Sequence, residues 1–255
     1  MESSSKIQPI VRKLGSTTST YETVILMQST QTKRYLYSAY AGSLGAIVDH
    51  PVKAFLSDVP SAALPVIGGL FSQRREDLHF KVESREILRV GLASATVQGD
   101  YCDGSFVTVA TSTVEKLNIL DVITADAVVA RSTSVYPGNH AQGDADSEYH
   151  KASFYFSGSH FENLRIDGKL YDCRIHPDLQ PEEGCRLKIA EARHCSLFAD
   201  TCREICIPRF GKIYLGELDM YSSQSILTMV RVETDCPTKV RAIICHAKTN
   251  GKPVP

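Results

Sequence analysis

The sequence contains no tryptophan, no excess of charge of either sign and no long apolar run. Its 28 Lys and Arg residues balance 29 Asp and Glu residues, which gives a formal net charge of -1. Because no basic excess offers a counter-charge to phosphates, we expect no nucleic-acid partner. No run of about 18 apolar residues occurs, which predicts no membrane span. The absence of tryptophan disfavours a sugar site built on an indole platform, although tyrosines remain that could stack against a ring.

Short catalytic, phosphate-binding and targeting motifs are also missing. Gly42-Ser43-Leu44-Gly45 is too short for a phosphate-binding loop and lacks the G-K-[ST] ending. No G-x-S-x-G nucleophile elbow and no EF-hand spacing occur. Residues 1–20 are rich in Ser and Thr and have no apolar segment of the kind that a secretory signal needs. We therefore expect a cytoplasmic protein without a cofactor, and a flexible N-terminal tail over 1–20.

The eight cysteines predict free thiols rather than disulfides, because the chain is long, lacks a signal and has a full apolar complement. They are Cys102, Cys173, Cys185, Cys195, Cys202, Cys206, Cys236 and Cys245. Cys202 and Cys206 would lie one turn apart on a helix, which makes them weak candidates for a shared metal ion. They would need further ligands, such as Cys185 or His194, and no C-x-x-C pair exists. We expect these thiols to pack against a sheet and hold no metal.

Alternating apolar and polar residues between dense turn signals predict a single β-rich domain over 21–255. Expected strands cover 21–27, 35–37, 78–82, 87–92, 95–97, 106–110, 122–130, 154–156, 170–175, 212–218, 225–233 and 240–247. The clearest hairpin turns at Asp103-Gly104, because this pair favours a type I′ turn. Gly42 and Gly45 should interrupt any long element. Residues 50–69, which contain Pro51, Pro60 and Pro65, should form a loop with one helical turn at 52–56. Such a long loop can be a lid or a binding edge, but we favour a segment that covers one end of a sheet. Asn250-Gly251 should form a turn-like tail.

One late helix is expected after a break near 177–184 (PDLQPEEG). Its apolar residues recur at helical spacing over about 191–206, and Pro208 stands where such a helix should stop. The fold class is therefore mainly β, either an antiparallel sandwich or a barrel with hairpins. A β-solenoid ranks below these two architectures, because only two copies of a repeat are visible.

That repeat consists of Ser112–Asp121 and Ser159–Gly168, which share the pattern S-x-[VF]-E-x-L-x-I. Both stretches follow an alternating, strand-like run. We interpret them as parts of two related β units, about 95–131 and 152–176. The interpretation predicts that Leu117 and Ile119 occupy the same kind of buried strand position as Leu164 and Ile166. The alternative is chance, since such short strings are common.

The second copy also contains the best candidates for acid–base chemistry. His160 and Glu162 are two residues apart, so on a strand they would face the same side. Asp172 and His176 follow nearby, and all four are candidate catalytic residues. The first copy keeps the glutamate but has a threonine in place of the histidine, which favours a structural role for Glu162.

Two functions remain open from the sequence. The first is a non-catalytic β-module that binds a small molecule or a protein partner, or assembles with itself through sheet edges into a homo-oligomer. It rests on the absence of a complete catalytic constellation. The second is a cyclase, isomerase or hydratase with its acid–base pair inside a β-barrel cavity. An enclosed pocket that contains His160 and Glu162 would favour the second function.

Overall fold

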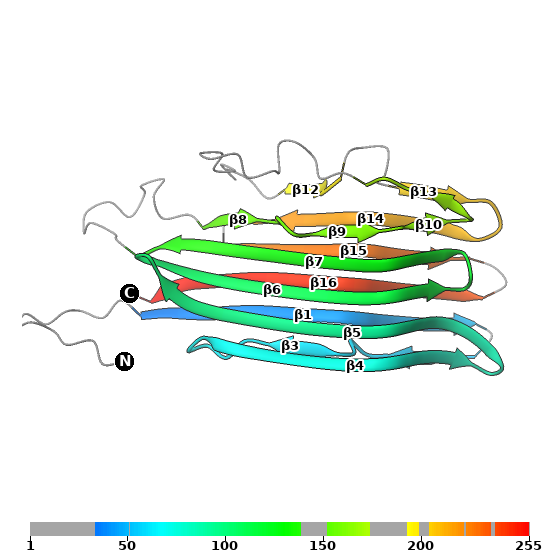
Figure 1. The fold of residues 1–255 in the computed structure, drawn as a ribbon, viewed down its shortest axis with the longest axis horizontal. Helices are drawn as coiled ribbons and strands as arrows, with labels where there is room; N and C mark the ends of the chain where they lie inside the picture. Colours follow the sequence, from blue (N-terminus) through cyan, green and yellow to red (C-terminus); the bar gives the residue numbers. More distant parts are fainter. Residues whose placement is uncertain are drawn as a thin grey trace, which may run out of the picture. The chain divides into compact units, whose positions relative to one another are not determined.

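The computed structural model describes residues 34–50, 52–138, 152–173, 193–198, 204–221, 223–235 and 238–254. Within these ranges all regular structure is strand, which confirms the mainly β prediction. The strands form two eight-stranded sheets. They stack face to face, so that β7 lies over β15 and β16, and β6 lies over β1 and β16 (Figure 1). The arrangement is sandwich-like, which decides between the two architectures that the sequence allows.

Sheet A contains the two chain-distant strands β1 and β16 as neighbours. Its path is β12 (Arg193–Ser196), β14 (Gly211–Met220), β15 (Gln224–Thr234), β16 (Lys239–Val254), β1 (Arg34–His50) and β2 (Ala54–Leu56). Beside this path, β14 also pairs with β13 (Glu204–Ile207), and β1 also pairs with β3 (Ser61–Ala63).

Sheet B is built from the middle of the chain. Its path is β11 (Lys169–Leu170), β10 (Arg165–Ile166), β7 (Ile123–Pro137), β6 (Ser105–Ile119), β5 (Arg85–Cys102) and β4 (Gly69–Val82). The short strands β8 (Ser153–Tyr155) and β9 (His160–Glu162) pair with β7. The long neighbouring strands run antiparallel. The chain thus begins sheet A, builds sheet B, and returns to complete sheet A.

The predicted hairpin between β5 and β6 is confirmed. Cys102 pairs with Ser105, so the loop consists of Asp103 and Gly104 alone. Their φ angles are 50° and 76°. Positive φ at both central residues is what a type I′ turn requires.

The glycines of β1 and β16 do not break their strands, contrary to prediction. Gly42 and Gly45 pair with β16 inside a continuous 17-residue strand, and Gly251 pairs with Tyr37 inside β16. Each glycine instead makes room for a side chain. A Cβ at Gly45 would lie 2.5 Å from Asp58 Oδ1, and a Cβ at Gly251 would collide with the Tyr35 hydroxyl. Close approach by a neighbour is the other common reason for glycine in a strand.

Residues 50–69 cover one edge of sheet A rather than forming an irregular loop. Ala54–Leu56 is strand β2, so the helical turn expected at 52–56 is wrong. Strands β2 and β3 both pair with β1. The backbone groups at this edge of β1 are thereby partly satisfied by the segment that follows it in the chain.

The prediction of a late helix over about 191–206 is wrong for the residues that the structure describes. Residues 193–196 and 204–207 are strands that pair with β14, while 199–203 lie outside the described residues. The open backbone edge of β14 offers hydrogen bonds that outweigh a weak helical periodicity, because tertiary context overrides propensity. Leu197 and Phe198 are two of the apolar residues that gave the sequence its helical spacing. In the structure both are fully buried directly after β12.

Several expectations fall outside the described residues. They are the tail over 1–20, the strand over 21–27 and the break near 177–184. The described residues all belong to one compact unit. None of the described residues form a helix long and apolar enough to cross a membrane.

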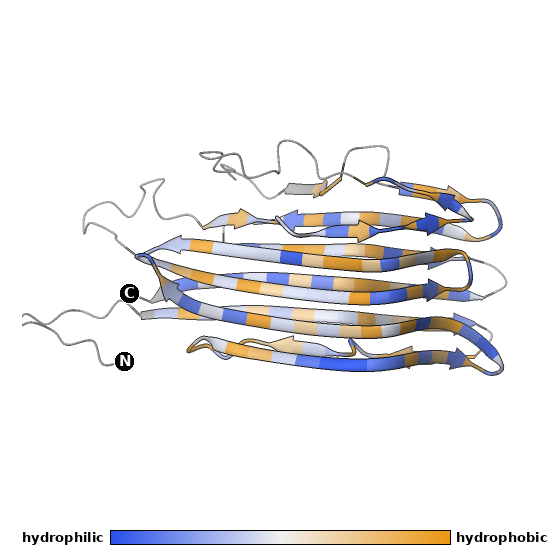
Figure 2. Ribbon diagram, in the orientation of Figure 1, coloured by the Kyte–Doolittle hydropathy of each residue, from blue (hydrophilic) through white to orange (hydrophobic). Residues whose placement is uncertain are grey.

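The core between the sheets changes in side-chain size along the strands. Aromatic rings fill one end, where Tyr35 stacks on Phe106 with ring centroids 4.4 Å apart. The middle is lined by small side chains, and the other end by branched aliphatic ones such as Ile119 and Ile244. Apolar and polar residues alternate along much of the long strands, whereas the middle of β4 is a hydrophilic run (Figure 2).

The two similar stretches flank β7 in equivalent positions. Glu115 of β6 and Glu162 of β9 both pair with Ala127. Ile119 of β6 and Ile166 of β10 both pair with Ile123. Positive φ recurs at three matching pairs: Lys116 and Asn163, Leu120 and Asp167, and Asp121 and Gly168. The four residues compared, Leu117, Ile119, Leu164 and Ile166, are all buried, although Leu164 lies between β9 and β10 rather than within a strand. The duplication itself stays a prediction.

Candidate functional site

The acid–base candidates of the sequence lie on an exposed face. His160 and Glu162 point to the same side of β9, with Nε2 3.3 Å from Oε1. Their side chains are 46% and 58% exposed. Asp172 is exposed beyond β11, and His176 lies outside the described residues. The structure therefore brings together the first two residues, outside the filled core between the sheets, and a catalytic role stays a prediction.

The cysteine candidates show no metal geometry within the described ranges. Cys206 is exposed on β13 and its thiol lies 3.6 Å from a Glu204 carboxylate oxygen, while Cys202 is not described. No group of three or more His, Cys, Asp or Glu side chains that could hold a metal ion occurs in the part of the chain that the structure describes. Cys245 is fully buried and donates to the Val128 carbonyl oxygen at 3.2 Å. Burial raises the pKa of its thiol to about 12.

A groove of about 610 Å³ opens on the outer face of sheet A. Its walls come from strands β1, β15 and β16 and from the segment that contains β2 and β3. The lining residues are Tyr40, Gly45, Ala46, Ile47, Phe55, Leu56, Ser57, Asp58, Ser61, Arg231, Glu233, Arg241, Ala242 and Ile243. Sequence reasoning placed no site here.

An irregularity in sheet A turns these residues outward. The pairing of β1 with β16 omits Ser43 and Cys245, and Cys245 has a φ of 52°. Ser43 and Leu44 are adjacent and both buried, so the side-chain alternation of β1 changes by one residue at this level. Beyond it the odd-numbered residues face outward on both strands, which places Ile47 and Ile243 in the groove.

Asp58 and Tyr40 form one wall of the groove. The Tyr40 hydroxyl donates to Asp58 Oδ2 at 2.6 Å. Gly42 and Gly45 leave the space that the Asp58 carboxylate occupies. Burial, reinforced by Asp58, raises the pKa of Tyr40 to about 12. Tyr40 therefore remains a hydrogen-bond donor at neutral pH.

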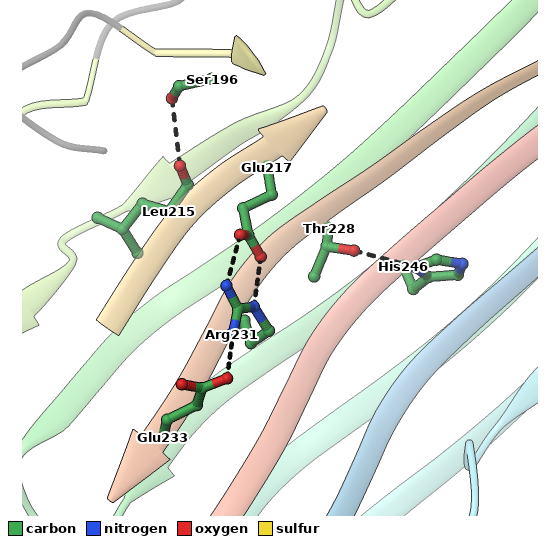
Figure 3. Close-up of polar contacts among 7 residues, drawn as sticks. All are labelled: Ser196, Leu215, Glu217, Thr228, Arg231, Glu233 and His246. Atoms are coloured by element: carbon green, nitrogen blue, oxygen red, sulfur yellow. Dashed lines mark hydrogen bonds and ion pairs between the residues drawn. The ribbon is translucent and has the colours of Figure 1, made fainter. Parts of the chain in front are cut away.

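His246 lies behind this wall on β16. Its Nδ1 lies 3.1 Å from the Thr228 hydroxyl oxygen. Figure 3 draws this contact as a dashed line. Its ring centroid is 6.2 Å from that of Tyr40. Burial lowers the pKa of His246, and the Asp58 charge opposes this effect. The imidazole is consequently neutral at physiological pH.

Arg231 borders the groove with its charge already matched. Its Nε and one terminal nitrogen each donate to Glu217 at 2.7 Å, a bidentate pair, and its other terminal nitrogen contacts Glu233 (Figure 3). The guanidinium carbon also lies 3.8 Å from the centroid of the Tyr214 ring. The hydrogen bonds to Glu217 raise the pKa of Arg231 further. This guanidinium is held in place and has little capacity for another anion.

Arg241 is much less engaged. Its side chain is 56% exposed, and its hydrogen bond to Asp49 is long, at 3.4 Å. It pairs across the strands with Ile47 on one side and Glu233 on the other. The Glu233 carboxylate, however, contacts Arg231. Most of the five N–H donors of Arg241 are thus left to solvent or a ligand.

Three large apolar side chains lie exposed beside Arg241. Phe55 is 69% exposed, Ile243 39% and Ile47 37%. Ile47 pairs with Phe55 on β2. The groove therefore combines an apolar surface, an incompletely paired guanidinium and a carboxylate–hydroxyl pair. Small-molecule sites are mostly apolar with a few placed polar groups, and the lining of this groove has that composition.

The chain matches a family model over residues 35–194, which is more than half of its length. The match covers β1 to β11 and the start of β12 and omits the strands that supply Arg231 and Arg241. No curated protein and no solved structure matches the chain. The chain belongs to the family described as "Domain of unknown function (DUF8256)".

Proposed function

We propose that the protein is a non-catalytic β-module that binds a small apolar molecule in the groove of sheet A. The observation that carries this proposal is the grouping of Phe55, Ile47 and Ile243 on the wall of a groove of about 610 Å³. Sites for small molecules have volumes of about 300–1,000 Å³ and are mostly apolar with a few placed polar groups. Exposing such side chains together costs solvation free energy, which a bound ligand would recover.

Self-assembly through a sheet edge is a weaker form of the same hypothesis. Among the residues that the structure describes, strand β4 forms one edge of sheet B, and it carries the run Arg74-Arg75-Glu76-Asp77 in its middle (Figure 2). Charged residues along an edge strand discourage pairing with a second copy. We therefore place ligand binding ahead of self-assembly.

The test uses the neutral dye Nile red, whose fluorescence rises in apolar surroundings, with the full chain. The variant Phe55→Ser should reduce dye binding at least about fivefold, because it removes the most exposed apolar side chain of the groove. The matched control is Phe71→Ser on β4, where the phenylalanine is 42% exposed but does not line the groove. The control should bind the dye like the wild type. Equal losses in both variants, or no binding by the wild type, would refute the proposal.

A further inference from the structure

We infer that Arg241 makes the groove selective for an apolar monocarboxylate, a ligand with one carboxylate and an aromatic or aliphatic body. The inference rests on the proposed function and specifies its ligand. Three features of the groove carry it: the unequal pairing of its two arginines, the apolar side chains next to one of them, and the position of Asp58.

The two arginines differ in how many acceptors they already have. Arg231 has a bidentate partner in Glu217 and a second carboxylate in Glu233. Arg241 has a single long contact, to Asp49, among the residues that the structure describes. A planar guanidinium with free parallel donors binds a carboxylate in a bidentate manner. Arg241 is therefore the anion-binding group of the groove.

The apolar side chains fix where the rest of the ligand lies. Ile47 is directly across from Arg241, and Ile243 is two residues from it on β16 and faces the same side. Phe55 extends the same surface on β2. A carboxylate held by Arg241 would thus place an attached hydrocarbon body on these three side chains. Contact with apolar walls also lowers the local dielectric constant, which strengthens the ion pair.

Asp58 limits the ligand to one negative charge. It lies over Gly42 and Gly45, whereas Arg241 is level with Ile47 further along β1. A second carboxylate on a ligand that extends along β1 from Ile47 toward Gly45 would approach the Asp58 carboxylate and be repelled. The same separation sets the orientation, with the anionic end at Arg241 and the uncharged body on Ile47, Ile243 and Phe55.

The experiment compares three phenyl-substituted four-carbon probes that differ in the charge of one end. They are 4-phenylbutyrate, neutral 4-phenylbutanamide and cationic 4-phenylbutylamine, each titrated into the full chain by calorimetry at pH 7 and low salt. The carboxylate should bind at least about tenfold more tightly than the amide. Arg241→Gln should abolish that difference without changing the affinity for the amide or the melting temperature. Arg74→Gln, an exposed arginine on β4, is the matched control and should leave all three affinities unchanged.

The outcomes separate this inference from the proposed function. Equal affinities for the carboxylate and the amide would refute the role of Arg241 while the Nile red result stands. Tighter binding of the amine would assign recognition to Asp58 and overturn the inference. If Nile red binds at Phe55 but 4-phenylbutyrate does not bind, the inference fails alone. If neither molecule binds, the proposed function fails with it.

Discussion

Three buried hydroxyls join the two sheets and permit a quantitative test of the fold. Ser132 of sheet B lies 2.6 Å from Ser225 and 2.9 Å from Thr249 of sheet A, and the latter two are 2.9 Å apart. All three are fully buried. In Ser132→Ala, Ser225 and Thr249 keep the hydrogen bond between them, but one of their two hydroxyl protons loses its acceptor. An unsatisfied buried hydroxyl costs about 1–3 kcal/mol. For a domain of this size that corresponds to a fall in melting temperature of about 4–8 °C at 2 kcal/mol.

Ser134, two residues further along the same strand, is the matched control. It is 1% exposed, and its hydroxyl has no hydrogen-bond partner in the part of the chain that the structure describes. Ser134→Ala therefore removes an unsatisfied group and should be neutral or stabilising by up to about 1 kcal/mol. Urea unfolding followed by circular dichroism would measure both variants, with an unchanged m-value as the condition for comparison. Equal destabilisation by the two substitutions would refute the reasoning, because packing alone would then explain the loss.

Local signals predicted those parts of the fold that depend on neighbouring residues. The turn at Asp103 and Gly104 is an example, since its two positive φ angles are met by residues that tolerate them. The central strands were found as well, because one face of each is buried and the sequence alternates accordingly. Their full lengths were not predicted. The length of β1 was missed because Gly42 and Gly45, which were expected to interrupt it, instead leave room for the Asp58 side chain.

The failures share a cause in long-range contacts. The expected helix near 191–206 has strands at both of its described ends because β14 offers an unpaired edge. Lys116 and Cys245 have φ angles of 54° and 52°, which ordinary side chains rarely adopt. The neighbouring residues contain no sequence pattern that predicts these positive φ angles. The angles occur where two paired strands both change, by one residue, which of their side chains face the core.

The groove could not be predicted for the same reason. Its residues come from three stretches, near 40–61, 231–233 and 241–243, that meet only when β16 pairs with β1 and β15. Each stretch by itself looks like an ordinary strand or loop. The one feature of the sequence that pointed to this region was the proline-rich segment around Phe55. We interpreted it as a segment that covers the sheet rather than as the wall of a binding site.

Three further predictions concern the buried Leu164, the exposed His160 and the pH dependence of stability that His246 causes. Leu164→Ala should cost about 2–5 kcal/mol in urea unfolding, because the side chain is 1% exposed, whereas Leu170→Ala, at 60% exposed, should cost less than about 0.5 kcal/mol. His160→Ala should leave the melting temperature within about 1 °C, because the imidazole is on the surface, and a fall of several degrees would contradict its placement there. The third prediction uses the lowered pKa of His246. Above pH of about 6.5 the imidazole is neutral in both the folded and the unfolded chain, so it adds no pH dependence. Below that pH the unfolded chain takes up the proton first, so the free energy of unfolding should fall as the pH falls toward the lower folded-state pKa. His246→Gln should flatten this fall between pH 7.5 and 5.5 in urea unfolding, and an identical fall in wild type and variant would show that His246 is not buried as a neutral group.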